Sequence, residues 1–120
     1  MSKIISAANV MITNRHLITD VIEANSSSEI FFRYKTRYIW SITRSQDKIF
    51  LHFYPNAHNT ESLAELEPYE WQDYSPIISY NSVELGTKEA KSTFEELQLV
   101  VKEKLLNMDK VLDDIIGDFF

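Results

Sequence analysis

The chain has 120 residues, a formal net charge of −6 and no cysteine, and 44% of its residues are hydrophobic. This length fits one domain, and the apolar content is enough for one hydrophobic core. The absence of cysteine excludes disulfides, thiolate catalysis and cysteine-ligated zinc. It also fits a reducing compartment, so we expect a cytoplasmic protein.

Glycine is scarce as well. Only Gly86 and Gly117 are present, whereas loops that cradle phosphate groups need several glycines so that backbone amides can approach the ligand. Walker-type and dinucleotide-binding functions are therefore excluded. No apolar run reaches the ~20 residues of a membrane-spanning helix. The first nine residues also lack the continuous apolar core of a signal peptide.

Charge is distributed unevenly along the chain. Residues 1–59 hold seven lysine and arginine residues against four acidic ones, a balance of +3. Residues 60–120 hold five against fourteen, a balance of −9. Such asymmetry bears on partners and on electrostatic steering, and it carries no information about the fold. It favours a basic partner for the second half of the chain.

The first predicted element is a helix over residues 14–24, with Thr13 as its N-cap. Its apolar residues recur at helical spacing. They are Leu17, Ile18, Val21 and Ile22. For residues 7–12 the pattern leaves two alternatives open, an extension of this helix or a short edge strand. The polar residues 25–28 favour a turn that ends the helix.

From residue 29 onward, helical spacing gives way to the alternation of strands. Residues 29–35, 37–44 and 48–54 are rich in aromatic and β-branched residues and are separated by short polar breaks. This predicts a three-stranded antiparallel meander. One of its faces is apolar and is expected to form the core. The residues of that face are Ile30, Phe32, Tyr34, Tyr38, Trp40, Ile42, Ile49, Leu51 and Phe53.

A connection over residues 56–76, with a candidate helical turn at 60–66, leads to a predicted fourth strand at 77–81. Gly86 and Thr87 then open a long helix, whose apolar stripe recurs every three or four residues from Ala90 to Phe119. Asn107 is a candidate break, where it would cap a second helix. The expected fold class is α+β: an N-terminal helix, the meander plus a fourth strand, and a long C-terminal amphipathic helix packed on the sheet.

The second face of the meander is the first candidate site. It mixes aromatic residues with cations and a histidine, where a solvated face is mostly polar. The residues expected to bind a partner are Phe31, Arg33, Phe50, His52 and Tyr54. A protein-binding face is the preferred interpretation. The alternatives are a platform for single-stranded nucleic acid, which the acidic net charge opposes, and coverage by the chain's own loop or terminus.

The acidic connection is the second candidate site. Its carboxylates alternate with apolar and aromatic side chains, which suits a basic partner because aromatic rings anchor and charges steer. The candidate residues are Glu61, Glu65, Glu67, Glu70, Trp71 and Asp73. The alternative is a connection that packs its apolar residues on the edge of the core and leaves its carboxylates in water.

The C-terminal stripe is the third candidate. Eight helical turns span roughly 40 Å, whereas a strand of five to eight residues spans ~17–26 Å, so the sheet cannot cover the whole stripe. Either the helix breaks near Asn107 and folds back, or its end packs on another chain. The hypothesis for the second case is a homodimer. Its interface would contain Met108, Leu112, Ile115 and Phe119.

The sequence contains no clear motif for catalysis, metal binding or cofactor binding. His58 and Glu61 are three residues apart, but a metal site needs a third and usually a fourth ligand at a defined spacing. No serine lies in a glycine-flanked elbow. We therefore expect no metal and no cofactor, and a catalytic function is not the preferred interpretation.

The leading functional hypothesis is a non-catalytic protein-interaction module. It would be a small acidic partner that masks, inhibits or chaperones another protein, as immunity proteins and chaperones do. The alternative is a small-ligand-binding domain or an enzyme, with a pocket between the sheet and the long helix lined by Tyr34, Trp40 or Phe94. A single-stranded nucleic-acid binder that uses the basic aromatic face is the third hypothesis.

Overall fold

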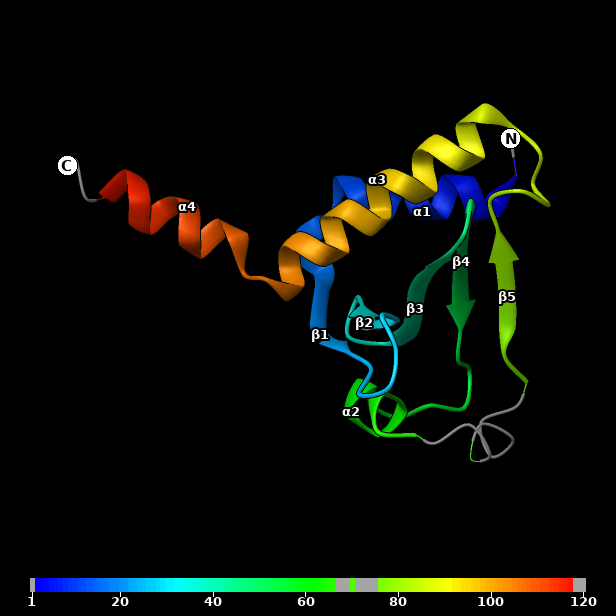
Figure 1. Cartoon of the computed structure of the whole chain (residues 1–120), viewed down its shortest axis with the longest axis horizontal. Coiled ribbons are helices and arrows are strands. Elements are labelled where there is room, and N and C mark those ends of the chain that lie inside the picture. The colour runs from blue at the N-terminus through cyan, green and yellow to red at the C-terminus, as the bar shows by residue number, and fades with distance from the viewer. Residues whose placement is uncertain (1, 67–69, 71–75, 118–120) are drawn as a thin grey trace.

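The computed structural model describes residues 2–66, 70 and 76–117. Within them the chain forms a five-stranded antiparallel sheet whose strands pair in sequence order. This confirms the predicted α+β class, with one strand more than expected (Figure 1). The elements are α1 (Lys3–Thr13), η1 (Arg15–Leu17), β1 (Ile18–Glu23), β2 (Ile30–Tyr34), β3 (Tyr38–Ser45), β4 (Lys48–Phe53), α2 (Thr60–Ala64), β5 (Ile78–Asn81), α3 (Lys88–Leu105) and α4 (Met108–Gly117).

The N-terminal region differs from the prediction. Residues 7–12 belong to α1, which begins after Ser2, whose hydroxyl accepts a hydrogen bond from the Ile5 amide at 3.4 Å. The prediction of a helix over residues 14–24 is wrong. Asn14 ends α1, and the segment after it forms the 3₁₀ turn η1 and the strand β1 at one edge of the sheet.

A bulge in β1 explains why its apolar residues imitate a helix. The register with β2 shifts between Thr19 and Ile22, and Asp20 has a left-handed backbone with a φ of 52°. An extra residue at a bulge interrupts the alternation of a strand. As a result Ile18 and Val21, three residues apart, both contact the core on the α1 side, while Ile22 packs on the opposite face.

The predicted meander is confirmed as β2, β3 and β4. Cross-strand pairs such as Phe32 with Trp40 and Ile42 with Leu51 place the expected apolar residues on one face of the sheet. The strand predicted over residues 77–81 is β5, which pairs with β4 in antiparallel fashion.

The long C-terminal helix is present as α3 and α4, and the predicted break at Asn107 is confirmed. α3 begins after Thr87, whose hydroxyl accepts a hydrogen bond from the Ala90 amide at 3.0 Å. Asn107 has a φ of 54°, a left-handed conformation that asparagine tolerates and that is frequent just after a helix end. Among the described helices, none is long and apolar enough to cross a membrane.

Two apolar clusters hold the layers together. The larger lies between the sheet and the helices α1 and α3, which pack side by side over one face (Figure 1). It contains most of the predicted core face, but Tyr38 is exposed and Phe53 is half-buried at one end of the sheet. The smaller cluster lies on the other face, beneath α2. Its buried residues are Phe31, Ile39, Tyr54, Leu63 and Ala64.

Candidate functional site

The second face of the meander is partly covered by the chain itself. Phe31 is fully buried and Tyr54 nearly so, and both pack against Leu63 and Ala64 of α2. A partner cannot contact these two rings while α2 is in place. The structure therefore assigns them to the second core cluster, in agreement with the alternative of own-chain coverage. Phe50 and His52 are half-buried on the same face.

Arg33, also expected to bind a partner, takes part in the fold. Its Nε donates a hydrogen bond to Asp20 Oδ2 at 2.7 Å, and its Nη2 donates to the carbonyl of His58 at 3.0 Å. It thereby connects β2 to the β1 bulge and to the segment before α2. Stacking of single-stranded bases needs accessible rings beside cations. This part of the face has buried rings and a paired cation, so it does not suit nucleic acid.

A polar cluster lies next to the buried rings. The Ser41 hydroxyl donates to Glu29 Oε2 at 2.5 Å, the Tyr54 hydroxyl donates to the same oxygen at 3.0 Å, and the two hydroxyls are 2.8 Å apart. Burial and the negative charge of Glu29 raise the pKa of Tyr54, so its phenol stays protonated and can donate. The three groups satisfy one another, as buried polar groups must in a stable fold.

His52 lies beside this cluster, opposite Ser79 of β5 in the sheet. Its Nδ1 is 2.6 Å from the Ser79 hydroxyl. An open pocket of about 330 Å³ lies here, lined by Glu29, His52, Tyr54, Ile77 and Ser79. A serine beside a histidine is a pair used in nucleophilic catalysis. Among the described contacts, however, the Glu29 carboxylate is bound by hydroxyls and not by the imidazole, so the histidine lacks the third group that orients a catalytic base.

The state of His52 leads to a prediction about stability and pH. Burial lowers the pKa of its imidazole from the ordinary 6.5, and the negative charge of Glu29 opposes that shift only in part. Below pH 6.5 the unfolded chain therefore binds more protons at this position than the folded chain does. The free energy of unfolding should fall as the pH is lowered through this range.

The expected result is that His52→Gln loses less stability than the wild type between pH 7.5 and pH 5.5 (both about one unit from the ordinary imidazole pKa), as measured by urea unfolding. The matched control is His16→Gln, which removes an exposed imidazole. Equal losses in the wild type and in His52→Gln would contradict the prediction.

The acidic connection is described in part. Glu61 of α2 and Glu65 just after it are exposed, and Glu70 is half-buried. Glu67, Trp71 and Asp73 lie outside the described residues. A partner-binding role for this segment stays a prediction.

α4 exposes a continuous apolar stripe. None of its residues is buried, and the four large aliphatic side chains after Met108 are 43–56% exposed. They are Val111, Leu112, Ile115 and Ile116. Together with the half-buried Met108 they recur at the spacing of one helix face, i, i+3, i+4, i+7 and i+8. The helix extends away from the rest of the molecule (Figure 1). The predicted dimer-interface residue Phe119 lies outside the described residues.

The acidic residues of α4 lie outside this stripe. The helix carries three aspartates, Asp109, Asp113 and Asp114, against one lysine, Lys110. At 100° per residue, Lys110 and Asp114 lie about 160° from Leu112, on the opposite side of the helix, and Asp113 lies about 100° from it. Asp109 lies about 60° from Leu112, next to the edge of the stripe. α4 therefore has an apolar face with negative charge around it, on a helix that the rest of the described chain does not cover.

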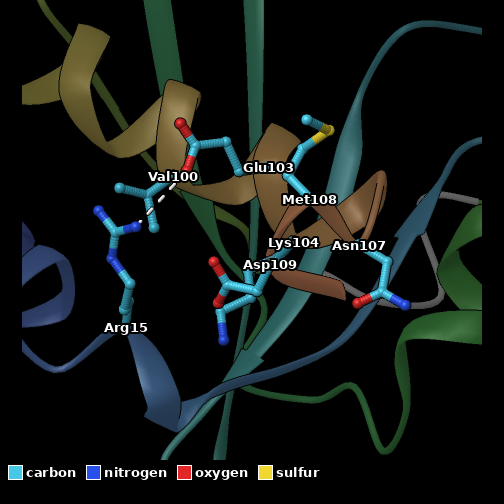
Figure 2. A pocket seen from close by; sticks show the side chains of 7 residues that line it. All are labelled: Arg15, Val100, Glu103, Lys104, Asn107, Met108 and Asp109. Carbon is cyan, nitrogen blue, oxygen red and sulfur yellow. Dashed lines mark hydrogen bonds and ion pairs between the residues drawn. The ribbon is translucent and has the colours of Figure 1, made fainter. Parts of the chain in front are cut away.

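The junction between α3 and α4 is a small polar site. Figure 2 shows the Arg15 guanidinium facing the Glu103 carboxylate, with Asn107 and Met108 at the turn; the Nη1 to Oε2 distance is 3.5 Å. The space between these side chains has a volume of about 60 Å³, enough for a few water molecules and too small for an organic ligand. We interpret this junction as a structural connection between η1 and the base of α4.

An apolar groove lies between α1 and one end of the sheet. Its volume is about 490 Å³, it is open to solvent, and its lining is almost wholly apolar. The lining residues are Ser6, Ala7, Val10, Met11, Tyr34, Tyr38, Trp40 and Phe53. Tyr34 and Trp40 were expected to line a pocket, whereas Phe94, named with them, is fully buried in the core. One wall of the groove is α1. The sequence pattern did not decide between helix and strand for residues 7–12, so it could not predict this wall.

The surroundings of the groove are basic. Lys35 and Arg37 occupy the turn between Tyr34 and Tyr38, and the Arg37 guanidinium lies 5.5 Å from the centre of the Tyr38 ring. α1 contributes Lys3 and no acidic residue. An acidic, apolar binding partner would meet complementary chemistry here.

Comparison of the chain with protein-family models, with curated proteins and with solved structures finds no match. The described residues also contain no group of three or more histidine, cysteine, aspartate or glutamate side chains that could hold a metal ion. A functional conclusion therefore has to come from the geometry of the chain itself.

Proposed function

We propose that this chain is a non-catalytic protein-interaction module that binds its partner through the apolar face of α4. The observation that carries the proposal is that α4 holds four aliphatic side chains at 43–56% exposure and buries none of its residues. A ten-residue helix is marginal in water without packing on its apolar face. An amphipathic helix that docks in an apolar groove is a common mode of protein recognition.

The partner that fits this helix has an apolar groove with basic residues around it. α4 has an excess of aspartate over lysine, and residues 60–120 carry a balance of −9. Opposite charge on the partner would speed association and disfavour wrong partners. Binding of this kind suits a small acidic protein that masks, inhibits or chaperones another protein. A cytoplasmic location is part of the proposal, and the absence of cysteine supports it.

The proposal is tested with the double variant Leu112→Asp/Ile115→Asp. Two carboxylates in the middle of the apolar face would have to be buried without partners on binding, which is strongly unfavourable. We expect the tagged wild type to retain a partner from lysate of the native host, and the double variant to lose at least about nine-tenths of it, since burial of an unpaired charge costs tenfold or more in affinity.

The matched control is Lys110→Asp, which places the same carboxylate on the polar side of the same helix. It should retain the partner at the wild-type level. Circular dichroism of all three proteins checks that the fold is unchanged. A partner retained equally by the wild type and the double variant would show that α4 is not the binding element.

Binding of a small apolar ligand is the second candidate function. The observation that favours it is the groove beside α1, whose volume of about 490 Å³ lies in the usual range of ligand sites.

A further inference from the structure

The chain has two large apolar surfaces that the described residues leave uncovered, the face of α4 and the groove beside α1. We propose that the groove of one molecule receives α4 of a second copy of the same chain. This inference rests on the proposed role of α4 as a binding element, and it adds a second copy of the chain as a binding partner and the groove as the receiving surface.

The two surfaces match in polarity. The groove is lined by four aromatic side chains at one end of the sheet and by small and aliphatic residues of α1. α4 offers branched aliphatic side chains on one face of a ten-residue helix. Contact between an aliphatic stripe and an aromatic groove removes apolar surface from water on both sides. Exposed patches of this kind on a single molecule mark interaction sites.

The charges also match. Asp109 lies at one edge of the apolar stripe of α4, and Asp113 and Asp114 lie on the polar side of the helix. Lys35 and Arg37 lie at the turn that connects two strands of the groove. The lining of the groove holds no charged residue. In this arrangement the apolar surfaces meet in the centre and opposite charges meet at the rim, as in typical protein interfaces.

The occupant has to come from another molecule. Only Leu106 and Asn107 separate α3 from α4, α4 leads away from the body of the molecule (Figure 1), and no α4 residue lines the groove. Within one chain, therefore, the helix does not reach the groove in this conformation.

A reciprocal exchange explains how short helices could support a dimer. α4 has ten residues, about 15 Å of helix, so a single contact is small against the ~800 Å² per partner of a standard interface. If each molecule inserts its α4 into the groove of the other, the two equivalent contacts are related by a two-fold axis and the buried area doubles. A small ligand in the groove would leave α4 uncovered, whereas the exchange covers both surfaces.

The test uses light scattering coupled to size-exclusion chromatography across a concentration series. We expect the wild type to be a dimer that dissociates on dilution. Val10→Asp alters the groove and Leu112→Asp alters the helix, and each variant alone should associate on the order of tenfold or more weakly. The control is Val83→Asp, since Val83 is 52% exposed and Val10 51%, and Val83 lies in neither surface. It should dimerise like the wild type.

Mixing the two variants identifies the surfaces that meet. The Val10→Asp protein keeps an intact α4, and the Leu112→Asp protein keeps an intact groove, so an equimolar mixture can form one complete contact per pair. We expect the mixture to contain heterodimers at concentrations where each variant alone is monomeric. A dimer formed by α4 against α4 would instead leave Val10→Asp fully dimeric by itself, and that result would overturn the inference.

Further outcomes separate this inference from the proposed function. A wild type that is monomeric at all concentrations overturns the inference. If it then binds dodecanoate in calorimetry, and Val10→Asp does not, the groove belongs to a small amphipathic ligand. A monomeric wild type that still retains a host protein through α4 supports the proposed function alone. A dimer that shows the mixing result and retains no host protein supports the inference alone.

Discussion

Phe94→Ala is expected to lower the free energy of unfolding by about 3–5 kcal/mol, the range for removal of a large buried aromatic side chain. Phe94 lies on α3 and is fully buried in the cluster that joins this helix to the sheet and to α1. Alanine would leave a cavity at the place where three elements meet, and close-packed neighbours collapse only in part into such a space. Urea unfolding followed by circular dichroism measures the change.

The matched control is Leu99→Ala on the same helix. Leu99 is 57% exposed, and both leucine and alanine favour helix, so the expected change is within about 0.5 kcal/mol. If Phe94→Ala were as stable as Leu99→Ala, α3 would not be packed on the sheet as described. The position of α4 would then be wrong as well, because α4 follows α3 directly in the chain.

Local patterns were sufficient to predict the meander and the C-terminal helices. The strands β2 to β4 are short segments rich in aromatic and β-branched residues, and short polar turns such as that at Gln46 connect them. For α3 the stripe of apolar residues is long enough to exclude a strand. The break at Asn107 was predicted because asparagine can cap a second helix, and in the structure Asn107 has the left-handed backbone that is frequent just after a helix end.

The N-terminal error had a specific physical cause. A bulge at Asp20 places Ile18 and Val21 on the same side of the sheet, and their spacing of three is also that of a helix. The sequence contains no signal of its own for this bulge, since its geometry depends on pairing with β2. Without β1 as a strand, residues 3–13 could not be recognised as the helix that covers the sheet.

The candidate sites depended on contacts that are distant in sequence. The pattern of the meander identified a second face that mixes aromatic residues with cations and a histidine. The cover of its buried rings is α2, a five-residue helix whose residues meet Phe31 and Tyr54 only in the folded chain. The groove is likewise formed by α1 and strand ends that the turns bring together. In contrast, the exposed stripe of α4 follows from helical spacing, and three of its four named residues lie on the described helix.

Phe31→Ala is expected to lower the free energy of unfolding by about 3 kcal/mol or more, although Phe31 was predicted to bind a partner. The ring is fully buried and packs 5.8 Å from the Tyr54 ring, centre to centre. Its removal would loosen the contact of α2 with the sheet, so α2 should lose amide hydrogen-exchange protection together with the loss of global stability.

Phe50→Ala is the control that separates folding from binding on this face. Phe50 lies on the same face of the sheet but is half-buried and stacks on His52 with a ring-centre distance of 5.8 Å. Alanine there removes less buried surface, and we expect a loss of about 1–2 kcal/mol with α2 still protected. A wild-type stability for Phe31→Ala, with weaker partner binding, would mean that α2 opens in solution and that the ring acts as a binding residue. The expected result is a large loss of stability for Phe31→Ala, which would place this ring in the core. Partner binding would then depend on α4 and the groove.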